Sequence, residues 1–112
     1  MMMVEAIIQP SKFEAVKDAL MEVGVRGMTV AEVRGFGTEK GRPATYRGAT
    51  MTNESVQRLR LQIAVSDRQM PAVRDAIQRA AHTGSIGDGK LFIYPINEVI
   101  RIRTRDKGEA AL

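Results

Sequence analysis

The segment formed by residues 59–65 alternates between apolar and polar or small side chains at every position. A period of two places successive side chains on opposite faces of a strand, so this segment predicts a strand with one face in a core. It is the clearest strand pattern in the chain, and a second layer must cover its apolar face. That face carries Leu59, Leu61, Ile63 and Val65, and the opposite face carries Arg60, Gln62 and Ala64.

Two helices are predicted, one before and one after this strand. The first shows the capping-box pattern of Ser11 and Glu14 and ends at Gly24. The second begins at Ser66 or Asp67, with Pro71 in its first turn, where a missing amide donor costs little. Each helix has one apolar stripe, which is typical of a helix that packs on a sheet. The stripes are Phe13, Val16, Leu20 and Val23 in the first helix, and Met70, Val73, Ile77 and Ala80 or Ala81 in the second.

Further strands are expected over residues 3–8, 28–36 and 90–94, with a short final strand over 98–103. The order of these elements predicts one domain over residues 1–112 with an α+β, ferredoxin-like β-α-β-β-α-β sandwich. Both helices then cover one face of an antiparallel sheet. The other face mixes apolar and polar side chains, which favours its burial between subunits.

Two segments lack a periodic pattern. Residues 35–57 contain several glycines and no sustained apolar period, and a loop of this length inside a compact domain is normally functional or disordered. The tail over residues 104–112 is polar with small side chains, so we expect it to be mobile unless a partner docks on it.

Composition narrows the possible functions. The 112 residues carry a formal net charge of +4, contain no cysteine and are 4% aromatic with no tryptophan. The lack of cysteine excludes disulfides and cysteine-based metal sites, and the scarcity of aromatic side chains disfavours nucleic acid as a partner. No signal peptide and no apolar run of about 20 residues is present, so a cytoplasmic location is expected. No nucleophile and base have a recognisable spacing, which argues against an enzyme.

A glycine-rich segment over residues 84–90 could bind an anion. Its Gly84, Gly89 and Lys90 nearly match the Walker phosphate-binding pattern. Leu91 nevertheless stands where that pattern needs a Ser or Thr for magnesium, and a strand follows in place of a helix. Glycines still allow backbone amides to approach an anion, and Lys90 adds a positive charge. The alternative interpretation is an ordinary turn.

Two arginines follow this segment. Arg101 and Arg103 would share one face of the predicted final strand, with Ile100 and Ile102 turned into the core. Two guanidinium groups on one face suit phosphate oxygens, although a solvated strand face would look the same. His82 follows the second helix, where the helix dipole favours a histidine, and it has no second histidine with which to bind a metal.

Together, these segments resemble the PII nitrogen-regulatory family. The matching stretches span nearly the whole chain, and the glycine-rich segment with the Arg-Ile-Arg-Thr sequence at 101–104 is the most specific. The stretches are residues 5–8, 27–30, 32–37, 40–41, 46–49, 83–84, 86–90 and 99–104.

The resemblance implies a homotrimer that binds ATP or ADP in clefts between subunits, and 2-oxoglutarate together with Mg²⁺ and ATP. Residues from about 37 to 55 would form the family's T-loop, which docks on a target enzyme, transporter or regulator. Any contact with a membrane would be indirect, through a transporter. Residues from about 82 to 90 would form the B-loop.

The resemblance also implies a set of ligand-binding residues. The adenosine pocket would be lined by Ile7, Met28, Thr29, Gln62 and Ala64. The phosphates would meet Gly87, Asp88, Gly89, Lys90, Arg101 and Arg103, and the backbone of Gly35, Phe36, Gly37 and Thr38 would close over them. The effector would meet Glu39, Lys40, Gly41 and Arg58, and Glu39 would contact Mg²⁺.

The chain departs from the family pattern mainly in and beside the T-loop. Members usually carry Arg, Gln and Lys where this chain has Thr38, Glu39 and Arg58. A carboxylate at residue 39 could bind Mg²⁺ but would face the dianionic 2-oxoglutarate at close range. Members often carry an acidic residue where this chain has Gln62. Met51 replaces the tyrosine that is modified in the family, so uridylylation or adenylylation is impossible there.

The expected function is therefore non-enzymatic regulation of nitrogen-metabolism targets through bound adenine nucleotides, with a weakened response to 2-oxoglutarate. Two alternatives stay open. The substitutions could be tolerated in a standard nitrogen sensor. The chain could instead be a divergent sensor of energy charge or inorganic carbon, with ADP, AMP or bicarbonate as ligands and no 2-oxoglutarate response.

Overall fold

The structure is a computed structural model that describes residues 1–37, 44–46, 49–51 and 54–112. Its main strands and helices follow the order expected from the sequence, with short 3₁₀ helices added. The elements are β1 (Met2–Ile8), the 3₁₀ helix η1 (Pro10–Lys12), α1 (Phe13–Glu22), β2 (Thr29–Gly37), β3 (Ala44–Tyr46), β4 (Ala49–Met51), β5 (Glu54–Val65), α2 (Met70–Ala81), β6 (Lys90–Pro95) and the 3₁₀ helix η2 (Gly108–Ala111).

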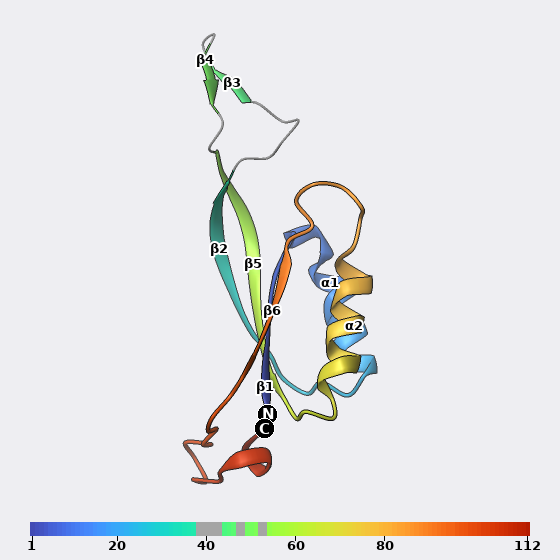
Figure 1. Ribbon diagram of the computed structural model, residues 1–112, viewed down its shortest axis with the longest axis vertical. Coiled ribbons are helices and arrows are strands. Elements are labelled where there is room, and N and C mark those ends of the chain that lie inside the picture. The colour runs from blue at the N-terminus through green and yellow to red at the C-terminus, as the bar shows by residue number, and fades with distance from the viewer. Residues whose placement is uncertain (38–43, 47–48, 52–53) are drawn as a thin grey trace.

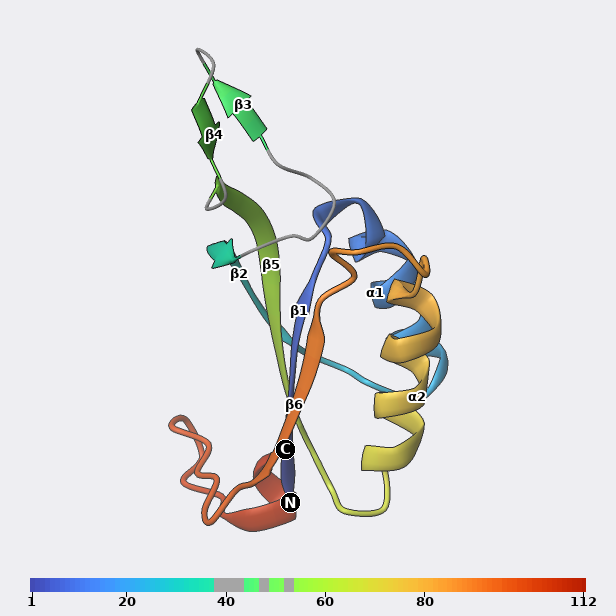
Figure 2. The same ribbon diagram turned by 45° about the horizontal axis from the view of Figure 1, so that its top comes forward.

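Four strands form one antiparallel sheet in the order β2-β5-β1-β6. Figure 1 shows α1 and α2 side by side on one face of this sheet, and the turned view in Figure 2 shows the same two layers. Neither α1 nor α2 covers the opposite face, and η2 lies near it only at the end of the sheet where Met3 and Ala64 are found (Figure 1 and Figure 2). This arrangement confirms the predicted ferredoxin-like fold.

The core lies between the sheet and the two helices. Val4 pairs with Ile63 and Ala6 with Leu61 across β1 and β5, and these four side chains are at most 2% exposed. Burial of each large apolar side chain stabilises the fold by about 1.5–3 kcal/mol. The helices contribute the predicted stripes, whose fully buried members are Val16, Leu20, Val73 and Ile77.

The start of α1 differs from the capping box that the sequence predicted. Ser11 lies inside η1, and the residue before α1 is Lys12, which makes no side-chain capping bond. Pro10 fixes its own φ and starts a tight turn, so Ser11 is already in a helical turn and lacks the extended backbone of an N-cap. The predicted end is correct, since Gly24 follows α1 with φ of +89°.

The N-cap position of α2 also differs from the proposed caps, since it lies two or three residues after Asp67 and Ser66. The N-cap position is Gln69, and Ser66 Oγ accepts a hydrogen bond from the Gln69 amide at 3.2 Å. Asp67 instead forms an ion pair with the Met1 amino group at 2.9 Å. Pro71 does lie in the first turn, as predicted. Within the described residues, neither α1 nor α2 has the length and hydropathy that crossing a membrane requires.

The hairpin of β2 and β5 is longer than the sequence pattern indicated. Strand β5 begins at Glu54 rather than Leu59, and its first residues pair with the glycine-containing end of β2. Both strands therefore run past the ends of the helices in Figure 1. Beyond them, β3 and β4 form a separate two-stranded sheet within the predicted T-loop. The sequence of this outer part of the hairpin shows no alternation of apolar side chains, because neither α1 nor α2 packs on it there and neither face needs to be apolar (Figure 1).

The predicted final strand over residues 98–103 is wrong. Only Ile100 forms a bridge, to Lys107, and the intervening residues make a turn in which Arg105 has φ of +65°. The turn is closed by hydrogen bonds from the Arg101 amide to the Asp106 carbonyl and from the Gly108 amide to the Val99 carbonyl. The tail that was expected to be mobile therefore folds back and ends in η2.

Candidate functional site

The loop between α2 and β6 packs directly on β1. Gly89 has φ of +93°, and a Cβ placed on it would lie 1.7 Å from the carbonyl oxygen of Ile7. No residue other than glycine fits at this approach. Ile7 is also the register partner of Lys90. The fold thus brings together Ile7, Gly89 and Lys90, three of the residues that the sequence assigned to a ligand site.

Asp88 closes this loop on itself. Its Oδ2 accepts hydrogen bonds from the amides of Thr83 at 2.8 Å and Gly84 at 2.9 Å, and its Oδ1 accepts one from the Thr83 hydroxyl. The Thr83 hydroxyl in turn accepts a hydrogen bond from the Ser85 amide at 3.1 Å. The hydrogen bond from the Thr83 side chain, followed by that from the Thr83 amide, lowers the pKa of Asp88 from 3.8 to about 2.

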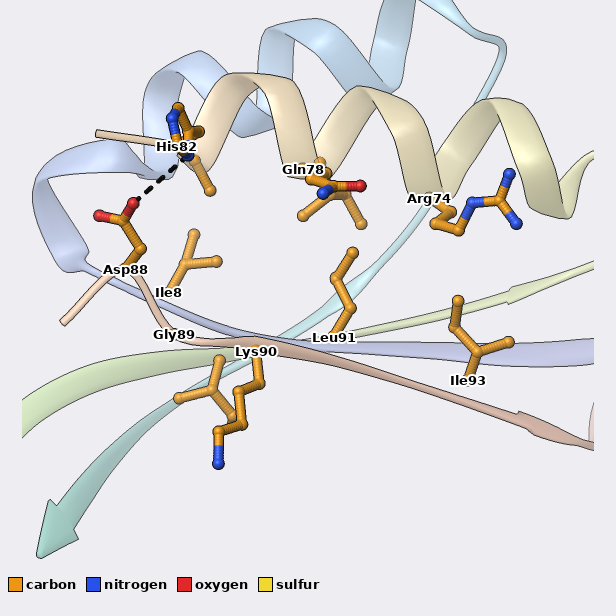
Figure 3. A pocket seen from close by; sticks show the side chains of 12 residues that line it. Ile8, Arg74, Gln78, His82, Asp88, Gly89, Lys90, Leu91 and Ile93 are labelled. Atoms are coloured by element: carbon orange, nitrogen blue, oxygen red, sulfur yellow. Dashed lines mark ion pairs between the residues drawn. The ribbon is translucent and has the colours of Figure 1, made fainter. Parts of the chain in front are cut away.

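A groove of about 410 Å³ lies between α2 and the edge strand β6. Figure 3 shows that Asp88 points toward His82 on the helix side of the sheet, whereas Lys90 projects from the opposite side. The Nδ1 atom of His82 lies 3.6 Å from Asp88 Oδ2. The lining is mainly apolar, with Arg74 and Gln78 on the helix side; its apolar members are Ile7, Ile8, Ile77, Ala81, Leu91 and Ile93.

A second cavity, of about 640 Å³, lies where β5 extends past the start of β2. Thr29, the first residue of β2, pairs with Gln62, so the rest of β5 has no partner on this side. Four of the five predicted adenosine-pocket residues line this cavity, namely Met28, Thr29, Gln62 and Ala64. Gln62 donates a hydrogen bond from Nε2 to Glu5 Oε1 at 3.0 Å.

The fifth predicted member of the adenosine pocket, Ile7, lies elsewhere. It is four residues along β1 from Met3, which lines the second cavity. At about 3.3 Å per residue, the separation is about 13 Å. One copy of the chain therefore holds Ile7, with Gly89 and Lys90, apart from the other four predicted adenosine-pocket residues.

The two arginines do not share a strand face. Arg101 Nη2 donates a hydrogen bond to the Leu112 carbonyl at 3.2 Å, and its Nη1 lies 4.0 Å from Asp106 Oδ2. Arg103 is exposed in the turn. The isoleucines that were expected in the core are also exposed, Ile100 by half and Ile102 by 94%. The reversal of the chain after Ile100 is the reason, since alternation between two faces holds only in a continuous strand.

Four further predicted residues lie on β2 and β5, the strands that lead into the T-loop. Gly35 pairs with Val56, Phe36 is 74% exposed, and Gly37 is the last residue of β2. Arg58 donates a hydrogen bond from Nη1 to the carbonyl of Gln57 at 2.8 Å. Thr38, Glu39, Lys40 and Gly41, with their predicted ligand contacts, lie outside the described residues, as does the side chain of Met51 at the modification position.

Sequence reasoning missed several parts of these sites. Thr83 and Ser85, which complete the hydrogen-bonded loop, were assigned to the loop but given no role in it, although Thr and Asp side chains commonly bond to nearby amides in turns. Ala111 and Leu112, which line the second cavity, carry no local signal of this role. Within the described ranges, no group of three or more His, Cys, Asp or Glu side chains is placed to hold a metal ion.

The fold and these sites define a small ferredoxin-like domain with a glycine-rich loop beside its edge strand and an extended hairpin. The profile of the family described as "Nitrogen regulatory protein P-II" matches residues 1–106. The chain belongs to this family, and membership makes it a signal-transduction regulator by class.

Curated relatives of this chain carry the same description. It is 53% identical over 109 residues to "Nitrogen regulatory protein P-II" of Nostoc punctiforme, covering 97% of each chain. It is 47% identical over 109 residues to the protein of the same name from Azospirillum brasilense, again with 97% of each chain covered. It is 45% identical over 112 residues to "Nitrogen regulatory protein GlnK" of Escherichia coli, with both chains fully covered.

Proposed function

We propose that this chain is a cytoplasmic, non-enzymatic regulator that binds ATP or ADP between the subunits of a homotrimer and acts on target proteins through its T-loop. The observation that carries the proposal is the contact of Gly89 with Ile7 beside Lys90. It forms a loop in which backbone amides and an ammonium group can meet phosphate oxygens.

The separation between two groups of predicted nucleotide residues supports a site between subunits. In one copy, the group at Gly89 and Lys90 and the group at Met28 and Thr29 lie at different edges of the sheet. In an oligomer, the group at Met28 and Thr29 of one copy can lie against the group at Gly89 and Lys90 of its neighbour. A ring of three copies would complete three nucleotide sites, each formed by the same interface between two neighbours.

The uncovered sheet face supports assembly. Phe92 and Tyr94 on β6 are 46% and 41% exposed. They pair across β1 with Glu5 and Met3, so all four side chains point away from the helices. Exposed aromatic side chains on a sheet face favour burial against another copy.

We further propose that 2-oxoglutarate binds weakly, because Glu39 and Thr38 replace the residues usual in the family. The nucleotide site is expected to be retained, since its basic residues are present. If 2-oxoglutarate is not an effector, the runner-up function is a sensor of energy charge or inorganic carbon.

Isothermal titration calorimetry tests these proposals. ATP, ADP and AMP are titrated with and without Mg²⁺ and 2-oxoglutarate, and light scattering after gel filtration gives the number of subunits. We expect ATP and ADP to bind to a trimer. Lys90→Ala should weaken both, whereas Lys17→Ala, which removes an equal charge from the surface of α1, should not. No binding of any adenine nucleotide would overturn the proposal. Tight 2-oxoglutarate binding with Mg²⁺ and ATP would identify a standard nitrogen sensor.

A further inference from the structure

A carboxylate stands in the middle of the loop proposed to hold phosphates. Asp88 lies between Gly87 and Gly89, and a free carboxylate at this position would repel an anion. Its oxygens, however, already accept three hydrogen bonds from Thr83 and Gly84. The carboxylate is therefore engaged by its own loop.

The direction of the side chains separates Asp88 from its neighbour Lys90. Figure 3 shows the Asp88 carboxylate on the helix side of the sheet and the Lys90 ammonium on the other side. Lys90 belongs to the uncovered face, because its partner Ile7 alternates with the buried Ala6 and Ile8. An anion bound by Lys90 would thus lie on the side away from the Asp88 carboxylate.

The loop backbone depends on this arrangement. Gly87 and Gly89 have φ of +105° and +93°, and they flank Asp88 on either side. The hydrogen bonds of Asp88 tie the end of the loop to its beginning at Thr83 and Gly84. These hydrogen bonds hold the loop in the conformation in which Gly89 contacts the carbonyl oxygen of Ile7.

We propose that Asp88 is a positioning residue for the phosphate-binding loop rather than a ligand of the nucleotide, and that Thr83 is its partner. This inference rests on the proposed nucleotide function. Asp88 closes the loop through Thr83 and Gly84, and the closed loop presents the amides around Gly87 and Gly89, together with Lys90, to the phosphates of ATP. His82 lies near the same carboxylate but holds no loop backbone, so it is not part of the closure.

The experiment compares ATP and AMP affinities by calorimetry in the full-length protein. Thr83→Val removes the hydroxyl with little change in shape, Thr83→Ser retains it, and Asp88→Ala removes the carboxylate. His82→Ala is the matched control. We expect Thr83→Val and Asp88→Ala to weaken ATP binding by about tenfold, the effect of one charge-assisted hydrogen bond. The ratio of ATP to AMP affinity should fall, because the loss is confined to the phosphate end.

Coupling between the two residues gives a second readout. The double variant Thr83→Val with Asp88→Ala should bind ATP no more weakly than Asp88→Ala alone, since both changes open the same closure. Thr83→Ser and His82→Ala should bind ATP as the wild type does. In Asp88→Ala, amide hydrogen exchange at Thr83 and Gly84 should become faster.

Several outcomes would overturn the proposal. If Asp88→Ala and Thr83→Val bind ATP as tightly as the wild type or more tightly, the closure does not position the loop. Equal losses for ATP and AMP would indicate a general loss of structure instead. Should Asp88→Ala fail to fold, the Thr83→Val and Thr83→Ser pair decides the question. Failure of the wild type itself to bind ATP would instead refute the nucleotide function on which this inference depends.

Discussion

Gly89 and Ile7 lie in direct backbone contact, with the position of a Cβ on residue 89 only 1.7 Å from the Ile7 carbonyl oxygen. This contact joins the loop after α2 to the central strand β1. It places the glycine-rich loop at the edge of the sheet, next to Lys90. The integrity of the candidate phosphate site therefore depends on a residue that has no side chain.

Substitution of Gly89 tests this contact. Gly89→Ala combines a backbone clash with a positive φ, so we expect it to lower the free energy of unfolding by about 2–4 kcal/mol. Gly24→Ala has a positive φ of +89° but open space around it, and should cost only about 1 kcal/mol. Gly27→Ala has neither feature and serves as the neutral control. Urea unfolding of the three variants measures the differences, and equal losses at residues 89 and 24 would contradict the contact.

The position of the core predicts that substitutions of a buried and of an exposed residue change stability by different amounts. Leu61 is fully buried between the sheet and the helices, so Leu61→Ala should destabilise the protein by about 2–5 kcal/mol through lost burial and the cavity left behind. Met21, on the outer surface of α1, is 63% exposed, and Met21→Ala should change stability by less than about 0.5 kcal/mol. Thermal and urea unfolding compare the two. A small effect at Leu61 would place it outside the core.

The pKa of Asp88 predicts how stability depends on pH. It is lowered in the folded protein from 3.8 to about 2 by the hydrogen bonds from Thr83. Between these two values the unfolded chain binds more protons at this group than the folded chain, so folding stability rises with pH. The stabilisation from Asp88 is complete above about pH 4 and is lost as the pH falls through about 2.

Comparison with Asp88→Asn isolates this effect from the other carboxylates. The wild type should lose stability between pH 4 and pH 2 more steeply than the variant does. An NMR titration of the Asp88 carboxyl carbon should give a midpoint near the lower end of that range. A midpoint at the ordinary value of 3.8 would show that the Thr83 hydrogen bonds are not formed in solution.

Arg101 and Arg103 should differ in their effect on the C-terminal segment. Arg101 holds the end of the chain through a hydrogen bond to the Leu112 carbonyl, whereas the side chain of Arg103 is exposed and makes no such hydrogen bond within the described residues. Arg101→Ala should therefore speed amide hydrogen exchange over residues 108–112, and Arg103→Ala should not. Both variants should weaken ATP binding if both guanidinium groups meet phosphates, as the family resemblance implies. Unchanged exchange in Arg101→Ala would show that this contact does not hold the tail.

Local pattern was sufficient for most of the fold. The alternation ending at Val65 and the stripe of Val73 and Ile77 lie within single elements, and their burial depends only on which face meets the core. The residues at which the helices begin were less predictable. Ser11 had the right spacing for a cap, but the turn that begins at Pro10 had already set its backbone.

The candidate sites could be assembled from the sequence only in part. The glycines and Lys90 were recognisable because anion-binding loops need small residues and positive charge. The position of Arg101 was not, since the strand expected there is replaced by a turn whose hydrogen bonds join Val99 to Gly108. Nor could spacing show that Asp88 faces its own loop.

Periodicity and residue type thus established the strands, the helices and the composition of the glycine-rich loop, because these depend on neighbours in the chain. Tertiary structure alone decided that Gly89 meets Ile7 and that Met28 and Gln62 share a cavity with the end of the chain. It also set the Asp88 carboxylate and the Lys90 ammonium on opposite sides of the sheet. These relationships arise from strand pairing and packing between distant segments, and the free energy of such contacts has no counterpart in any local pattern.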